Sequence, residues 1–168
     1  MIWSLWEELE REFGLRIKDT HVPHFSYHVA RHYDLESLDG ILRHRASESA
    51  PFYVTSKALG VFPAPSPIFF LPLVLTLGLA MFHRTLWQEL SYIACGNELR
   101  YQPDDWIPGI ALTPDIDKDV SAELVQFLLK RDLSWKIAVD NIAVIHDTGM
   151  KQELASRFDF AGVPRGRT

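Results

Sequence analysis

Cysteine and positive charge are both scarce in this sequence. Cys95 is the only cysteine among 168 residues, so the chain cannot form an internal disulfide, and this usage fits a reducing compartment. The 17 Lys and Arg residues stand against 22 Asp and Glu residues, which gives a net charge of −5. Proteins that bind long nucleic acid usually carry a basic surface, so we expect no duplex DNA or RNA partner. A small anionic ligand held by a few local groups stays compatible with this charge.

The motifs that commonly hold nucleotide cofactors or metal ions are missing as well. The sequence has no Walker or dinucleotide-binding glycine motif, no H-E-x-x-H and no C-x-x-C. We therefore expect neither a cofactor nor a metal. The composition is that of a globular protein, with 47% hydrophobic, 12% aromatic and 23% charged residues, and it excludes collagen-like, disordered and disulfide-framework classes. A chain of this length usually forms one domain and can bury a core.

Long hydrophobic segments are also lacking. The first ten residues have no basic region and turn acidic at once, unlike a secretory signal. The one suspicious run covers residues 68–82, which carry no charge, and it is interrupted by Pro72 and Gly78. A membrane helix needs about 20 apolar residues, so this run is better explained as a buried strand that leads into a helix. We predict a cytoplasmic protein without a membrane partner.

Periodicity predicts four helices and six strands. Apolar spacings of three and four predict a helix over 3–13 that stops at Gly14, and Asp34 is a predicted N-cap for a helix that runs to about 46. A third helix is expected over 77–93, and Asp119 is the expected N-cap of the fourth. Strands are expected over 24–30, 52–62, 68–75, 107–113, 137–145 and about 153–160. The fold class is therefore α/β, in the α+β sense, with the element order α-β-α-β-β in each half.

One offset of 85 residues superposes the two halves. It places Pro23 on Pro108, Asp34 on Asp119 and Phe52 on Ile137. We predict a single bilobal domain over 1–161, with lobe one at about 1–75, lobe two at about 76–161, and a flexible tail over 162–168. Two pseudo-symmetric lobes would enclose a central cleft, and a cleft is the usual place for a ligand.

The first predicted strand begins with an unusual polar pattern. Side chains alternate along a strand, so His24, Ser26 and His28 share one face while Phe25 and Tyr27 share the other. The aromatic face suits the core. Polar side chains that face an apolar interior without hydrogen-bond partners cost free energy, so the polar face is expected to line the cleft. The same pattern would also arise from two histidines that are hydrogen-bonded within the protein or exposed on a half-exposed strand.

The run from Pro23 to Ser26 resembles the P-H-x-[T/S] element of the 2′-5′ RNA ligase-like, or two-histidine, phosphoesterases. The segments 52–62, 68–75, 79–87 and 101–112 are similar to this family too, so the resemblance covers about residues 20–160. It implies two lobes that each bring one such motif to a central cleft. One histidine would act as general base, the other as general acid, and the two hydroxyls would bind phosphoryl oxygens. Histidine suits both roles because its pKa of about 6.5 makes both protonation states accessible near neutral pH.

The second motif is degenerate. The expected P-H-x-[T/S] reads Pro108, Gly109, Ile110 and Ala111, so Gly109 replaces the histidine and Ala111 the hydroxyl. Loss of one general acid or base lowers a rate by roughly 10²–10⁴-fold. A shift of register to Thr113 would move the group about 13 Å along the strand, at about 3.3 Å per residue, and does not restore the motif. Because both residues are small, the groove is expected to have room there for the side chains that are missing.

Four residues are candidate substitutes or ligand contacts. His28 shares the face of His24, and His146 and Tyr101 would need loops to bring them in. Trp106 or Tyr101 could stack on a base, although both are better explained as packing residues, as are Trp3 and Trp6. His83 is expected to be structural, and His21 has no recognisable pattern.

The sequence therefore predicts a protein that acts on or binds a small phosphorylated ligand, or a short RNA end, through His24 and Ser26. As an enzyme it would be at best a 2′,3′-cyclic phosphodiesterase with one histidine missing. The alternatives are a non-catalytic nucleotide-binding protein that keeps the cleft, and a protein-interaction module of the same fold.

Overall fold

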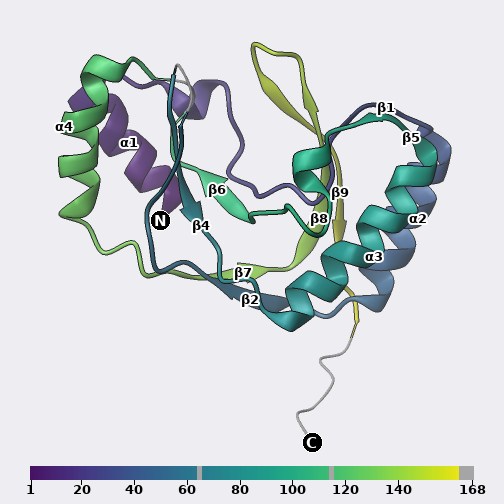
Figure 1. The fold of residues 1–168 in the computed structure, drawn as a ribbon. Helices are drawn as coiled ribbons and strands as arrows, with labels where there is room; N and C mark the ends of the chain where they lie inside the picture. The colour runs from purple at the N-terminus through teal and green to yellow at the C-terminus, as the bar shows by residue number, and fades with distance from the viewer. Residues whose placement is uncertain (64–65, 114–115, 163–168) are drawn as a thin grey trace, which may run out of the picture.

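The computed structural model describes residues 1–63, 66–113 and 116–162, and four α-helices lie in this part of the chain (Figure 1). Helix α1 ends at Gly14, which adopts a left-handed conformation with φ of 70° that glycine tolerates without strain. The Asp34 side chain caps α2, and Thr76 caps α3. The helices are α1 (Ile2–Phe13), α2 (Leu35–Glu48), α3 (Leu77–Ile93) and α4 (Lys118–Leu129).

The strands form small antiparallel sheets. The three-stranded sheet has the order β3-β4-β6, and the pairs β1-β5, β2-β7 and β8-β9 complete the described part. The bounds are β1 (Ala30–Tyr33), β2 (Phe52–Thr55), β3 (Gly60–Phe62), β4 (Ile68–Pro72), β5 (Ala94–Asn97), β6 (Gly109–Ala111), β7 (Lys136–Val139), β8 (Asn141–Asp147) and β9 (Gln152–Asp159). Short 3-10 helices cover Ile17–Asp19 and Leu99–Tyr101. This mixture of helices and sheets confirms the predicted α/β class.

Two hydrophobic cores lie on either side of the molecule (Figure 1). One joins α1 and α4 to β4 through residues such as Trp6, Leu71 and Leu124. The other joins α2 and α3 to β8 and β9 through residues such as Leu86 and Phe158. The ribbon of β2 and β7 runs between the two sides. Each core therefore draws on elements from both halves of the sequence.

Several predicted strands were too long or misplaced. The segment 52–62 holds two strands, because the chain leaves β2 after Thr55 and begins β3 at Gly60, and the segment 137–145 is likewise divided between β7 and β8. The predicted strand over 24–30 is wrong up to Val29, and only Ala30 belongs to β1. The pair β1-β5 was not predicted. The order α-β-α-β-β is therefore wrong in detail for both halves.

Two terminal details also differ from the prediction. The N-cap of α4 is Asp117, whose side chain accepts a hydrogen bond from the backbone of Asp119, the residue that was expected to be the cap. The predicted tail begins at Gly162, whose N–H donates to the carbonyl oxygen of Ser49, and residues 163–168 lie outside the described part. In the described residues, no helix has the length and hydrophobicity to cross a membrane.

Candidate functional site

The first motif lies in an irregular segment that side chains hold in place. Trp106 Nε1 donates to the carbonyl oxygen of Ser26 at 2.9 Å, and His83 Nε2 donates to the carbonyl oxygen of Tyr27 at 2.9 Å. The rings of His83 and Trp106 stack with centroids 3.7 Å apart. Two aromatic donors therefore replace, for this segment, the backbone ladder that a strand would supply.

The ring of His24 is oriented by the backbone two residues earlier. His24 Nδ1 and the carbonyl oxygen of Val22 lie 2.6 Å apart. A carbonyl oxygen only accepts, so Nδ1 carries the proton and the neutral ring presents a lone pair at Nε2. Burial lowers the pKa of His24 below its ordinary value of 6.5, although the hydrogen bond to Val22 opposes this shift. His24 is therefore mainly neutral at pH 7, with Nε2 as an acceptor.

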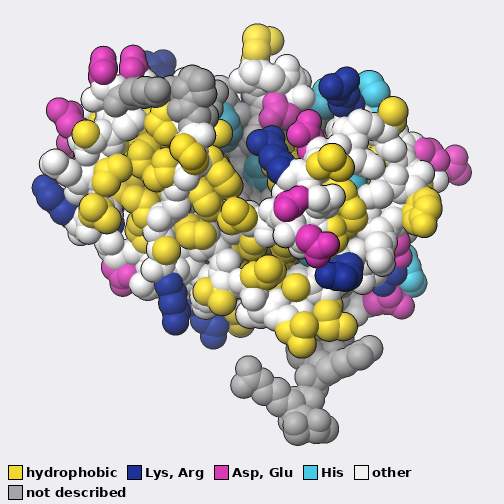
Figure 2. Space-filling view, in the orientation of Figure 1, with side chains coloured by type: hydrophobic (Ala, Val, Ile, Leu, Met, Phe, Trp, Pro, Cys, Tyr) yellow, Lys and Arg dark blue, Asp and Glu magenta, His cyan; other side chains and the backbone are white. Residues whose placement is uncertain are grey.

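His24 and Ala111 line the same small cavity. The other lining residues come from α1, from the segment before the first motif, and from the ends of β6 and β9; they are Trp6, Ile17, His21, Val22, Thr113 and Gln152. The space amounts to about 30 Å³, which is enough for a group the size of a water molecule. Figure 2 shows the surface hollowed between the two sides of the molecule, with histidine side chains at the bottom of the hollow. The first motif and one position of the second therefore meet.

The other position of the second motif is covered by an aromatic ring. A Cβ atom on Gly109 would lie 2.4 Å from Cδ2 of Phe70, closer than any real contact. Phe70 pairs with Ala111 across the β4-β6 ladder, so its side chain lies on the same face of the sheet as those of the second motif. Phe62 stacks on Phe70 with ring centroids 4.2 Å apart. The expected room at position 109 is therefore wrong, because Phe70 already fills it.

The remaining predicted site residues lie outside the lining of this cavity. His28 packs against Trp87 with ring centroids 4.6 Å apart, and its Nδ1 lies 2.7 Å from the hydroxyl oxygen of Tyr33. Trp106 is buried in a core, His146 is an exposed residue of β8, and Tyr101 ends a 3-10 helix. Ser26 contributes its backbone carbonyl to Trp106.

Sequence reasoning missed the cavity residues Ile17 and Val22 and four that carry a polar side-chain atom: Trp6, His21, Thr113 and Gln152. Thr113 had a usable signal, because it lies two residues after Ala111 and strand alternation puts the two on one face. His21 precedes His24 by three residues without any strand periodicity. Trp6 has the helical spacing of an ordinary core residue. Gln152 is the first residue of β9, and its Oε1 accepts a hydrogen bond from the N–H of Val22 at 3.3 Å. No local pattern marks these last three as neighbours of His24.

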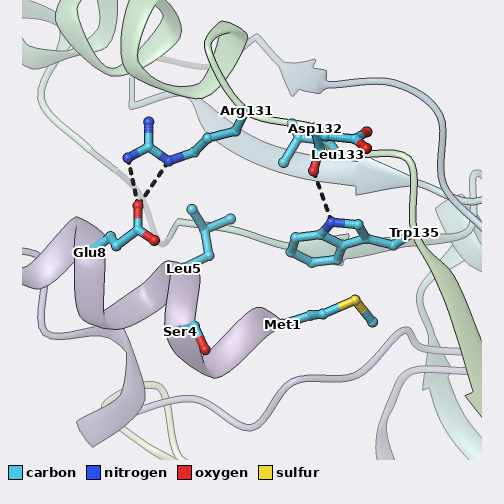
Figure 3. A pocket seen from close by; sticks show the side chains of 8 residues that line it. All are labelled: Met1, Ser4, Leu5, Glu8, Arg131, Asp132, Leu133 and Trp135. Atoms are coloured by element: carbon cyan, nitrogen blue, oxygen red, sulfur yellow. Dashed lines mark hydrogen bonds and ion pairs between the residues drawn. The ribbon is translucent and has the colours of Figure 1, made fainter.

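A larger cavity, of about 190 Å³, lies between α1 and the segment after α4 (Figure 3). Arg131 Nε donates to Glu8 Oε2 at 2.9 Å, and Trp135 Nε1 donates to the carbonyl oxygen of Asp132. These partners satisfy the cation and the indole within the protein. None of the residues that line this cavity belongs to either motif.

A family model described as the 2′-5′ RNA ligase superfamily matches residues 1–150. This match includes both motif segments and all of the cavity residues except Gln152. No curated protein matches the chain.

Proposed function

The chain belongs to the 2′-5′ RNA ligase superfamily, and we propose that it binds a small phosphate ester at the His24 cavity with impaired catalysis. The ligand class is a nucleotide, a 2′,3′-cyclic phosphate or the phosphorylated end of a short RNA. The observation that carries this proposal is that His24 and Ala111 line one cavity while Phe70 takes the place of a side chain at position 109. The histidine of the first motif is kept, and the ring of Phe70 occupies the space that the histidine of the second motif would need.

His24 is suited to the role of acceptor or general base. Its protonated Nδ1 faces Val22, so Nε2 remains to accept a proton or hydrogen bond from a ligand hydroxyl. Burial, by lowering the pKa, keeps this atom unprotonated at neutral pH. Nε2 would then accept from a water molecule beside a cyclic phosphate, or from the free ribose hydroxyl of a monoester, rather than donate to an anionic oxygen.

Hydrolysis of a cyclic phosphate needs a second proton donor or acceptor besides His24, and the second motif does not supply one. Opening a cyclic phosphate requires removal of a proton from the attacking oxygen and delivery of a proton to the leaving oxygen. Without the second group the rate is expected to fall by roughly 10²–10⁴-fold. Binding has no such requirement, so it is expected to outlast catalysis.

Calorimetric titration with 2′,3′-cyclic AMP tests the binding proposal. The wild-type protein should bind, and His24→Ala should weaken binding about tenfold or more, because hydrogen bonds in a buried site contribute about 1–3 kcal/mol. His32→Ala is the matched control, since His32 is an exposed histidine on β1, and it should leave the affinity unchanged. Equal affinities for wild type and His24→Ala would contradict the proposal.

A second candidate function is a surviving phosphodiesterase, and His21 is the observation that favours it. His21 lines the same cavity, and its Nδ1 lies 2.7 Å from the hydroxyl oxygen of Thr20. Thr20 also donates to the carbonyl oxygen of Ile17, which leaves its oxygen free to accept from Nδ1–H of His21. In this role His21 would be the acid and His24 the base. Turnover that is lost in both His21→Gln and His24→Gln would establish it.

A further inference from the structure

Trp6 carries a buried polar group that the described part of the protein leaves without a hydrogen bond. Its side chain is 1% exposed, and Nε1 has no partner among the described residues. An unpaired buried N–H is costly, and most buried polar groups in proteins have a partner, so this atom needs an explanation. The other two indole donors in the cores and loops described above, Trp106 and Trp135, both have backbone acceptors.

The position of Trp6 supplies that explanation. Trp6 comes from the buried face of α1 and lines the cavity that His24 and Ala111 also line. It therefore lines the same cavity as Ala111, the position at which the hydroxyl of the second motif is missing. An indole nitrogen only donates, so its partner must be an acceptor.

Thr113 offers a second donor in the same cavity. Its Oγ1 accepts from the backbone N–H of Phe69 at 3.0 Å, and the side chain is 1% exposed. Because the N–H of Phe69 occupies a lone pair of this oxygen, the hydroxyl proton remains available to a ligand. Trp6 belongs to the core of α1, α4 and β4, and Thr113 is buried and bonded to Phe69 of β4, so neither needs to be ordered by the ligand.

We propose that the Trp6 indole N–H and the Thr113 hydroxyl donate hydrogen bonds to the phosphoryl oxygens of the ligand, in place of the hydroxyl that Ala111 lacks. This inference rests on the proposed function. The cavity, of about 30 Å³, has room for small groups such as phosphoryl oxygens and not for a nucleoside, which would stay outside. Trp6 and Thr113 would supply donors to these oxygens, while Nε2 of His24 supplies an acceptor for a water molecule beside the phosphorus.

The lining also predicts which phosphate is preferred. No Lys or Arg is among the residues that line the cavity in the described part of the chain. Neutral donors compensate one negative charge more readily than two, because a buried charge without a countercharge is costly. A singly charged cyclic phosphodiester should therefore bind more tightly than a doubly charged monoester, whose second pKa is about 6.

The indole resonances of the five tryptophans report on this proposal directly. In ¹⁵N-labelled wild-type protein titrated with 2′,3′-cyclic AMP, the indole N–H resonance of Trp6 should move downfield as the hydrogen bond forms. Its assignment follows from its absence in Trp6→Phe. Trp6→Phe should also weaken binding about tenfold, which corresponds to about 1.4 kcal/mol, and Trp135→Phe, a matched loss of one indole donor outside this cavity, should leave it unchanged.

Thr113→Ser keeps the hydroxyl and should retain binding, whereas Thr113→Val should weaken it. If the wild-type protein binds but the Trp6 resonance stays in place, the proposed donor is wrong while the proposed function stands. The rings of Trp3 and Trp6 lie 5.3 Å apart in an edge-on arrangement. If the Trp6 resonance moves in Trp3→Phe but does not move when the ligand is added, the Trp6 N–H faces the Trp3 ring. That result would also overturn the proposal. If the wild-type protein binds neither 2′,3′-cyclic AMP nor 3′-AMP, the proposed function fails, and this inference fails with it.

Discussion

The ring of Phe70 lies where a side chain at Gly109 would begin, since a Cβ atom there would fall 2.4 Å from Cδ2 of Phe70. The same ring crosses Gly60 on the neighbouring strand, where a Cβ atom would lie 2.5 Å from Cε1. Phe70 thus lies between two glycines on a sheet face and stacks on Phe62. A histidine at 109 and the observed position of Phe70 are mutually exclusive. We therefore connect the loss of the second histidine with the packing of this ring.

Gly109→His alone is expected to destabilise the protein and to give no activity. The new side chain must displace the Phe70 ring, and overpacking of this kind costs about 1–3 kcal/mol. Urea unfolding measures the loss. Gly78→His is the matched control, since a Cβ atom at Gly78 has no neighbour within 4 Å; it should cost less. A Gly109→His protein as stable as wild type would show that Phe70 yields easily.

Repair of the site requires removal of the ring as well. The variant Phe70→Ala with Gly109→His and Ala111→Thr should hydrolyse 2′,3′-cyclic AMP roughly 10²-fold or more faster than Phe70→Ala alone, as expected for a restored acid or base. The gain should disappear when His24→Ala is added. Phe70→Ala by itself is expected to cost up to about 3–5 kcal/mol, so stability must be checked first. A folded triple variant that binds the ligand without faster turnover would contradict this account of the second motif.

Trp106 is expected to position the first motif. Trp106→Phe removes the 2.9 Å hydrogen bond to the carbonyl oxygen of Ser26 and should lower the free energy of unfolding by about 1–2 kcal/mol. It should also weaken binding of 2′,3′-cyclic AMP, because His24 lies two residues before Ser26 in the same segment. Trp135→Phe removes a similar indole bond, to the carbonyl oxygen of Asp132, and should leave binding unchanged. If the two variants weaken binding equally, the Trp106 bond does not position the motif.

Local signals in the sequence predicted the helices well, and long-range packing decided what they missed. Gly14 and Asp34 mark the ends of their helices, and α3 runs from Leu77 to Ile93 as its apolar stripe indicates. The segment 52–62 has a continuous strand composition, yet its two parts pair with different partners, β7 and β4.

In the candidate site, too, local motifs predicted some residues and long-range packing placed the others. His24 and Ala111 were identified from motifs, and they line one cavity. Phe70 and Trp6 come from a strand and a helix whose patterns indicate only core packing. Their places beside the motif depend on the tertiary arrangement, which no local pattern contains. The predicted pseudo-twofold stays a prediction, although the β2-β7 ladder pairs Tyr53 with Ala138, two residues that the offset of 85 also relates.

His28 is expected to make the protein less stable as the pH falls. Burial, with a smaller contribution from His83, lowers the pKa of His28 to about 4, below its ordinary value of 6.5. Between these values the unfolded chain takes up a proton that the folded protein does not, so the stabilisation present above pH 6.5 is lost as the pH falls toward 4. We expect a loss on the order of 2 kcal/mol, after allowance for the partial exposure of the ring.

Urea unfolding at several pH values checks this expectation. In His28→Gln the slope of stability against pH over this range should be smaller than in wild type. His32→Gln, at an exposed position on β1, should keep the wild-type slope. A slope that is unchanged by His28→Gln would mean that another group causes the acid sensitivity.

The central claim, a cavity that binds a phosphate ester but scarcely turns it over, is tested most directly by ³¹P NMR of 2′,3′-cyclic AMP mixed with the wild-type protein. The cyclic phosphate resonance should shift or broaden at once and then persist, and His24→Ala should reduce the change at the same concentrations. Rapid conversion to the monoester resonance in proportion to the amount of protein, or a resonance that the wild-type protein leaves unperturbed, would contradict the claim.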